Sequence, residues 1–218
     1  MKCYFIRHGK TKGNETLSFN GSGTDEPLTE IGRKELKRID GVPERALLFV
    51  SPMIRARETA SIMLPDLEQR VLSDLREMHF GSFEGKNHET LDGDPEYQAW
   101  LDSGGEMRIP GGEKRSEFAM RVYGAVGQAF IETEAEGADT MYIVAHGGTI
   151  MAAMSALTGE NYYLFNTPNG AGYVTELEVD DAGNELAATT YDRFCGGLSA
   201  GSSAWRPPRY TPSGDMDR

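Results

Sequence analysis

Short apolar runs of the β-strand type alternate along this chain with segments of helical spacing. Such alternation is typical of an α/β domain, in which helices cover a mostly parallel central sheet. Parallel sheets bind ligands at the carboxyl ends of their strands, so a functional site is expected there. The predicted strands are Cys3–Ile6, Leu47–Val50, Thr140–Ala145, Gly172–Val179 and Leu186–Tyr191; the predicted helices are Leu28–Ile39 with Thr29 as N-cap, Pro52–Leu64, Glu113–Glu136 and Gly148–Leu157.

Two segments depart from the alternation. Residues 74–112 are rich in Gly, Asp, Glu and aromatic residues, with short helical pieces near Glu89–Leu91 and Glu96–Leu101. We predict that they form a small helical lid inserted in the domain. From Gly196 onward the chain is rich in Gly, Ser and Pro, which favours irregular structure. The expected organisation is one α/β domain over residues 1–195, with a turn near Asp181–Gly183, and an irregular tail over residues 196–218.

Length and charge limit the classes of partner. The 218 residues suffice for one domain with a sizeable core. The formal net charge of −12 at pH 7 repels nucleic acid and anionic lipid, so neither is an expected partner. No apolar run approaches the roughly 20 residues of a membrane helix. Cys3 and Cys195 form no disulfide framework, so we expect a cytoplasmic protein with reduced thiols. The sequence sets no oligomeric state.

Basic and imidazole side chains follow three of the predicted strands. The first strand ends in Arg7-His8-Gly9, and a later one ends in His146-Gly147-Gly148. The strand between them runs into Ser51-Pro52 and then Arg55. Glycine allows the backbone to approach a ligand closely, and a helix that starts after His146 aims N–H groups at the same crevice.

A single histidine at a strand end is more often a satisfied polar group than a ligand-binding residue. Two histidines and two arginines at one edge of a sheet are different, because buried charges need partners. Arginine pairs with phosphate through two hydrogen bonds, and two arginines can neutralise a dianion. The pattern therefore predicts a site for an external tetrahedral dianion such as phosphate.

The same residues carry a resemblance to a known family. Arg7–Thr11 followed by Asn14 resembles the RHGxTxxN signature of the histidine phosphatase superfamily, also called the phosphoglycerate mutase-like family. The resemblance runs from about residue 3 to residue 192 and implies a three-layer α/β/α sandwich with a small helical lid. The other matching segments, in the family's order, are Thr24–Thr29 with Gly32, Ser51–Ala60, Leu75–Gly85, Pro110–Glu113 and Val144–Gly148.

The resemblance implies a role for each catalytic residue. His8 would attack phosphorus and carry the phosphoryl group as phosphohistidine, with its other ring N–H held by an acceptor such as a backbone carbonyl. Arg7, Arg55 and His146 would bind the phosphoryl oxygens. Glu77 would protonate the leaving oxygen and then activate water, which requires a raised pKa.

Four further residues are expected to bind the substrate, and no metal or cofactor is expected. Asn14 would be a hydrogen-bond donor that faces the substrate or supports the residues that do. The resemblance also assigns substrate binding to Thr11, Gly21 and Gly147. His79 and His88 lie among carboxylates but without the spacing of a metal site.

One loop departs from the family pattern. The family often has an arginine between the residue matching Asn14 and the next glycine, whereas residues 15–21 here contain no basic residue and one residue is added before Asp25. A carboxylate on the substrate thereby loses an expected partner, although Lys10 or Lys12 could substitute. The chain therefore resembles the phosphatase branch, which includes α-ribazole phosphatases, more than the mutases.

Three other interpretations compete with a phosphatase. A cofactor-dependent phosphoglycerate mutase remains the alternative within the family, and a non-catalytic phosphate-binding domain is the alternative outside enzymes. Gly197–Gly201 matches the GxSxG motif of serine hydrolases, but no histidine follows Ser199 and the strand–turn–helix context is missing.

Overall fold

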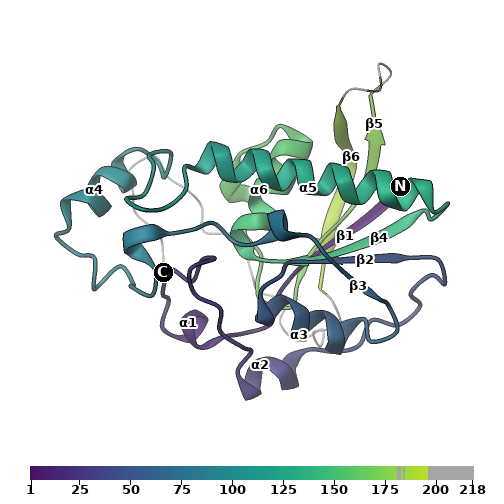
Figure 1. Ribbon diagram of the computed structural model, residues 1–218, viewed down its shortest axis with the longest axis horizontal. Coiled ribbons are helices and arrows are strands. Elements are labelled where there is room, and N and C mark those ends of the chain that lie inside the picture. The colour runs from purple at the N-terminus through teal and green to yellow at the C-terminus, as the bar shows by residue number, and fades with distance from the viewer. Residues whose placement is uncertain (181–182, 184, 196–218) are drawn as a thin grey trace.

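The computed structural model of this chain describes residues 1–180, 183 and 185–195 (Figure 1). The turn predicted near residues 181–183 lies mostly outside these residues, and the predicted irregular tail and the GxSxG segment lie wholly outside them. The described part contains no helix that is both long and apolar enough to cross a membrane.

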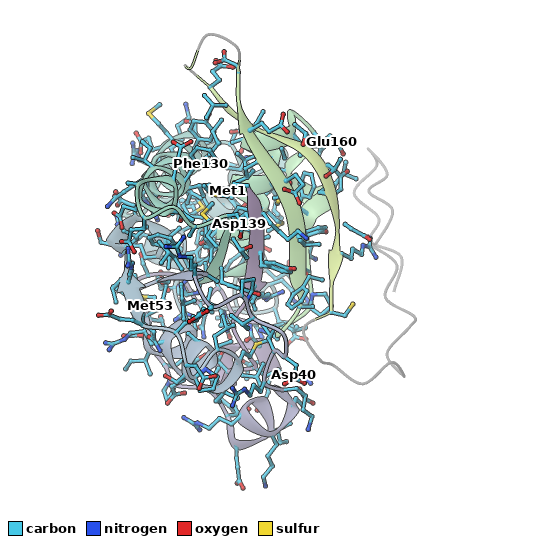
Figure 2. All side chains as sticks on the ribbon, turned by 90° about the vertical axis from the view of Figure 1, so that its right-hand side faces the viewer. Met1, Asp40, Met53, Phe130, Asp139 and Glu160 are labelled. Carbon is cyan, nitrogen blue, oxygen red and sulfur yellow. The ribbon has the colours of Figure 1, made fainter. Side chains whose placement is uncertain are left out.

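A six-stranded sheet runs through the molecule in the order β3-β2-β4-β1-β5-β6. The first four strands in this order pair in parallel, whereas β5 is antiparallel to β1 and β6 is antiparallel to β5. The sheet is thus mostly parallel, as predicted. Figure 2 shows Met1 beside Asp139, where β1 and β4 begin next to each other. The strands are β1 Lys2–Arg7, β2 Leu47–Val50, β3 Gln69–Val71, β4 Thr140–Ala145, β5 Gly172–Val179 and β6 Leu186–Phe194.

Helices cover both faces of the sheet and give the expected three layers. Figure 1 shows α5 and α6 on one face, and α1, α2 and α3 on the other. The helices are α1 Lys12–Glu15, α2 Glu30–Glu35, α3 Ile54–Met63, α4 Pro95–Asp102, α5 Arg115–Ala135 and α6 Gly147–Thr158; the 3-10 turns are η1 Ser73–Leu75, η2 Gly81–Phe83 and η3 Tyr162–Phe165.

Strand β4 divides the hydrophobic core in two. All six of its residues are buried, and successive side chains point to opposite faces of the sheet. Met141 and Ile143 join the core cluster beneath α5 and α6, whereas Tyr142 and Val144 join the cluster beneath α3. A strand covered on both faces reads as a continuous apolar run, which is why the sequence predicts it so well.

The first predicted helix is shorter than expected. Thr29 caps α2 as predicted, since its hydroxyl accepts a hydrogen bond from Gly32 N at 3.0 Å. The helix ends at Glu35 because Leu36 adopts an extended conformation and is buried in the core cluster beneath α3. The predicted range Leu28–Ile39 therefore runs past the end of α2, because tertiary burial of Leu36 outweighs the helical spacing.

Helix α4 lies at one end of the molecule, beyond the sheet (Figure 1). Its residues Tyr97 and Trp100 pack with Phe19 and Phe83, and Phe80 packs against Phe19, with ring centroids 5.2–6.1 Å apart across the cluster. The short helix expected near Glu89–Leu91 is a turn. Phe19 connects this aromatic cluster to the loop that precedes α2.

Candidate active site

The structure brings His8 and His146 together. His8 follows β1 and His146 follows β4, and these strands are neighbours in parallel register, so their carboxyl ends meet. The two imidazole centroids lie 5.1 Å apart with a 62° angle between the rings. Both side chains are buried, with exposed fractions of 4% and 0%. The predicted convergence at this sheet edge is present.

One ring nitrogen of His8 is held by the backbone. Nδ1 lies 2.7 Å from the carbonyl oxygen of Gly9, and because a carbonyl only accepts, Nδ1 carries the hydrogen. Nε2 of the neutral ring is then the unprotonated nitrogen. Burial, followed by the charges of Arg55 and Arg7, lowers the pKa of His8 well below its ordinary value. His8 is therefore neutral at pH 7, so its Nε2 has a free lone pair.

Both ring nitrogens of His146 contact protein groups. Arg55 Nε donates to Nδ1 at 3.1 Å, and since guanidinium only donates, Nδ1 is unprotonated. Nε2–H then donates to Ser51 Oγ at 2.7 Å. Burial first, and the charge of Arg55 next, lowers the pKa of His146 well below its ordinary value. To bind an oxyanion, Nε2–H would have to exchange Ser51 for the ligand.

Arg55 is fully buried and ties a loop to the site. Nη1 donates to Thr24 O at 2.7 Å, and Nη2 donates to Asn20 O at 3.2 Å and Gly21 O at 3.1 Å. Four of its five N–H groups have protein acceptors when the bond to His146 is included. Its charge faces the site, but one N–H of Nη1 is left for a ligand.

Arg7 has a buried donor without a partner. Nη1 donates to Thr167 O at 2.6 Å, whereas Nε is buried and has no hydrogen-bond partner among the described residues. An unmet buried donor costs about 1–3 kcal/mol, which an incoming anion could recover. The first residue of α6, Gly147, lies against this guanidinium, and a Cβ there would lie 3.2 Å from Arg7 Cζ.

Glu77 lies at the N-terminus of α6. Its Oε2 accepts from Gly148 N and its Oε1 from Met78 N, each at 2.9 Å. These bonds and the two arginines favour the carboxylate, but burial outweighs them, so the pKa of Glu77 is raised. A buried carboxyl with a raised pKa has the property that a general acid requires.

Three of the residues expected to bind the substrate, Asn14, Thr11 and Gly21, make close contacts with other protein groups. Asn14 Oδ1 accepts from the backbone N–H and the hydroxyl of Thr11, both at 3.1 Å, which leaves its Nδ2 for a ligand. Thr11 is fully buried and acts as the N-cap of α1. Gly21 makes a close backbone approach, since a Cβ there would lie 2.1 Å from Met78 O.

Two supporting residues were missed by the sequence analysis. Glu84 holds the loop that Arg55 contacts, because its carboxylate accepts from Gly21 N, Gly23 N and Thr24 Oγ1. Asn169 donates from Nδ2 to His8 O at 2.9 Å. Its signal in the sequence is an Asn-Gly pair directly before a strand, which marks a turn.

His79 is hydrogen-bonded to the neighbouring backbone. Its Nδ1 accepts from Gly81 N at 3.0 Å. In the described ranges, no three His, Cys, Asp or Glu side chains are grouped closely enough to hold a metal ion.

Comparisons with known proteins identify a matching family, related sequences and a similar solved structure. The model of the histidine phosphatase superfamily (branch 1) matches residues 3–191. A relative from Hydrogenobacter thermophilus, named "Putative phosphoserine phosphatase 2", is 31% identical over 89% of this chain and 96% of its own length. The adenosylcobalamin/alpha-ribazole phosphatase of Salmonella typhimurium is 27% identical over 72% of this chain and 79% of its own. A crystal structure of phosphoglycerate mutase from Thermus thermophilus is 32% identical, with a TM-score of 0.63, over 89% of this chain and 98% of that one.

Proposed function

This chain belongs to branch 1 of the histidine phosphatase superfamily, and we propose that it hydrolyses a small phosphomonoester, without a metal, through a phosphohistidine on His8. The observation that supports this most directly is the His8 ring, which is neutral, is held at Nδ1, and lies within the influence of the charges of Arg55 and Arg7 in a site that also holds an acid with a raised pKa. The proposed substrate is a small metabolite because His8, His146 and Glu77 are buried, and the net charge of −12 opposes nucleic acid.

In the first step, His8 Nε2 attacks phosphorus as the bond between phosphorus and the leaving oxygen breaks. Glu77 gives its proton to that oxygen, so an alcohol leaves. Arg7, whose Nε has no protein partner among the described residues, and the remaining N–H of Arg55 stabilise the equatorial oxygens. Asn14 Nδ2 is the further donor at the entrance.

In the second step, water attacks the phosphohistidine. Glu77, now a carboxylate, accepts a proton from that water while the bond between phosphorus and Nε2 breaks. Inorganic phosphate leaves, His8 returns to its neutral form, and Glu77 is protonated again. The pKa of Glu77, raised by burial, allows the same group to serve as acid and then as base.

The ion pairs of Lys10 and Lys12 favour hydrolysis over mutase activity. Lys10 Nζ pairs with Glu35 at 2.9 Å, and Lys12 Nζ pairs with Glu15 at 2.9 Å. Each lysine would have to leave an exposed ion pair, worth about 0.2–1 kcal/mol, before it could replace the arginine that the loop over residues 15–21 lacks. A phosphoglycerate mutase has to hold a carboxylate, so these ion pairs disfavour that alternative, and they disfavour phosphoserine as a substrate for the same reason.

The favoured substrate thus lacks a carboxylate. α-Ribazole 5'-phosphate meets this condition and is the candidate that the name of the Salmonella relative suggests. A non-catalytic phosphate-binding domain is less favoured, because both histidines, both arginines and the acid are all present. Cys3 and Cys195 are both free thiols, which supports a cytoplasmic location.

A substrate panel tests the proposal. The purified chain, in EDTA, is given p-nitrophenyl phosphate, α-ribazole 5'-phosphate, 3-phosphoglycerate, phosphoserine and sugar phosphates, with phosphate release and phosphate transfer measured separately. We expect metal-independent release, fastest without a carboxylate, and none from His8→Ala. Transfer between phosphoglycerates that exceeds release would favour the mutase, and no turnover of any compound would favour the binding domain.

A further inference from the structure

The segment before β5, residues 167–171, wraps around the end of β1. Because β5 runs antiparallel to β1, the residues that precede β5 meet those at the end of β1. Thr167 O accepts from Arg7 Nη1, Gly170 N donates to Arg7 O at 3.0 Å, and Ala171 O accepts from Arg7 N at 2.8 Å. This segment therefore holds both the backbone and the side chain of Arg7.

The side chain of Asn169 extends from this segment to the loop that carries the nucleophile. Its Nδ2 donates to His8 O at 2.9 Å and lies 3.4 Å from Gly9 O. It also donates to Asn14 Oδ1 at 3.1 Å. One amide group thus contacts three residues of the site, which lie 155 to 161 positions away in the chain.

The orientation of the Asn169 amide follows from the chemistry of its neighbours. The backbone N–H of Thr11 can only donate, so the Asn14 atom that it contacts is the oxygen Oδ1. The Asn169 atom that meets Oδ1 and the two carbonyls must therefore be the donor Nδ2. No flipped amide would satisfy these three acceptors.

We propose that Asn169 is a positioning residue for His8, an inference that rests on the phosphohistidine chemistry proposed above. It holds the Gly9 carbonyl, and that carbonyl holds His8 Nδ1, so the ring presents Nε2 in one direction. It also holds Asn14 Oδ1, so that Asn14 Nδ2 faces the phosphoryl group. Asn169 itself touches no reacting atom.

An ordinary turn residue would explain less. Asparagine before glycine is common in turns because it tolerates the required backbone and bonds to its own neighbours. Within the described part of the chain, the side-chain hydrogen bonds of Asn169 go to distant residues of the site and not to the turn. The identity of this side chain therefore matters for the nucleophile and not for the turn.

Asn169→Leu tests the proposal, because leucine is close in size, is neutral and donates no hydrogen bond. We expect kcat for p-nitrophenyl phosphate to fall by about 10²-fold, since a misplacement of about 1 Å costs that much. The inhibition constant for inorganic phosphate should change by less than about threefold, because the arginines remain. The inhibition constant for vanadate, which mimics the transition state, should rise in step with the loss in kcat/KM.

The matched control is Asn166→Leu, in which the same change is made three residues earlier. Among the described residues, no side-chain hydrogen bond joins Asn166 to the site, so kcat and both inhibition constants should stay within about twofold of wild type. If Asn169→Leu does not fold, as judged by thermal unfolding, Asn169→Ala replaces it. An unchanged kcat, or equal weakening of phosphate and vanadate, would overturn the positioning role.

Labelling with a quench in alkaline detergent, in which phosphohistidine is stable, separates this proposal from the broader one. Wild-type enzyme mixed with p-nitrophenyl [32P]phosphate should carry acid-labile label on His8, and Asn169→Leu should form that label more slowly. Absence of label from wild type would overturn the phosphohistidine mechanism itself. Label in wild type together with an equal labelling rate in Asn169→Leu would overturn only the role of Asn169.

Discussion

Glu77 and Gly148 are in contact so close that any side chain at position 148 would displace the Glu77 carboxyl group. Gly148 N donates to Glu77 Oε2 at 2.9 Å, and a Cβ on Gly148 would lie 2.4 Å from Glu77 Oε1. Because the glycine lies in the first turn of α6, the carboxyl group is held against the positive end of that helix. The Glu77 carboxyl group therefore owes its position to the hydrogen bond from Gly148 N and to the space left by the absence of a side chain on Gly148.

Gly148→Ala should lower activity by displacing the Glu77 carboxyl group. General acid catalysis contributes about 10²–10⁴-fold, so we expect kcat to fall by at least about tenfold. The matched control is Gly127→Ala in α5, where a new Cβ meets nothing within 4 Å. That variant should keep full kcat and gain about 0.5–1 kcal/mol in stability, measured by urea unfolding. Full activity in Gly148→Ala would show that the contact does not position the acid.

Glu77→Gln should slow the enzyme in a way that depends on the leaving group. An alkyl phosphate needs a proton on its departing oxygen, whereas p-nitrophenolate leaves without one. We expect kcat/KM to fall by about 10²-fold or more for alkyl phosphates, and by clearly less for p-nitrophenyl phosphate. The measurement is a series of phosphomonoesters whose leaving groups differ in pKa. Equal slowing across the series would remove Glu77 from the acid role.

Much of the site could be predicted because strand ends are local features. The end of β1 and the end of β4 are marked by an apolar run followed by histidine and glycine, so His8 and His146 follow from the sequence. Strand β3 was missed because it is only three residues long, Gln69–Val71, and two of the three are polar. Such a strand pairs only because β2 presents an open edge to it.

The supporting contacts could not be predicted, since they depend on strand order. Ser51 meets His146 only because β2 lies beside β4. Asn169 meets His8 only because β5 turns antiparallel to β1. Neither pairing is encoded in a local pattern, so the sequence marks Ser51 as a strand end and Asn169 as a turn without giving either a role.

Acidification should destabilise the fold through the two buried histidines. Burial and the nearby arginines lower the pKa of His8 and His146 well below 6.5, whereas in the unfolded chain both stay near about 6.5. Below that pH the unfolded state binds more protons, so stability is lost as the pH falls, by at most about 1.4 kcal/mol per pH unit for each histidine. The raised pKa of Glu77 has the opposite effect, because the folded state then binds more protons at low pH. The two histidines are expected to outweigh this single carboxyl group.

Urea unfolding of wild type between pH 5.5 and 7.5 measures this slope. His146→Gln removes one of the two titrating rings, so its stability should fall less steeply with acidification than that of wild type. His88→Gln is the control, because His88 is exposed and should leave the slope unchanged. A wild-type stability that stays level or rises on acidification would contradict the burial of both rings in their neutral form.

Substrate preference should change when Lys10 is released from its ion pair. Lys10 follows the nucleophile by two residues, and its Nζ pairs with Glu35 Oε1 at 2.9 Å. In Glu35→Gln the lysine keeps its charge but loses its partner, so it becomes available to a carboxylate on the substrate. An exposed pair is worth about 0.2–1 kcal/mol, so we expect kcat/KM for 3-phosphoglycerate to rise by about two- to fivefold relative to p-nitrophenyl phosphate.

Glu30→Gln, which frees Lys34 in the exposed pair on α2, is the control and should leave the ratio of kcat/KM for the two substrates unchanged. If the two variants give the same ratio, Lys10 does not reach the substrate, and the preference against carboxylates must come from the loop over residues 15–21.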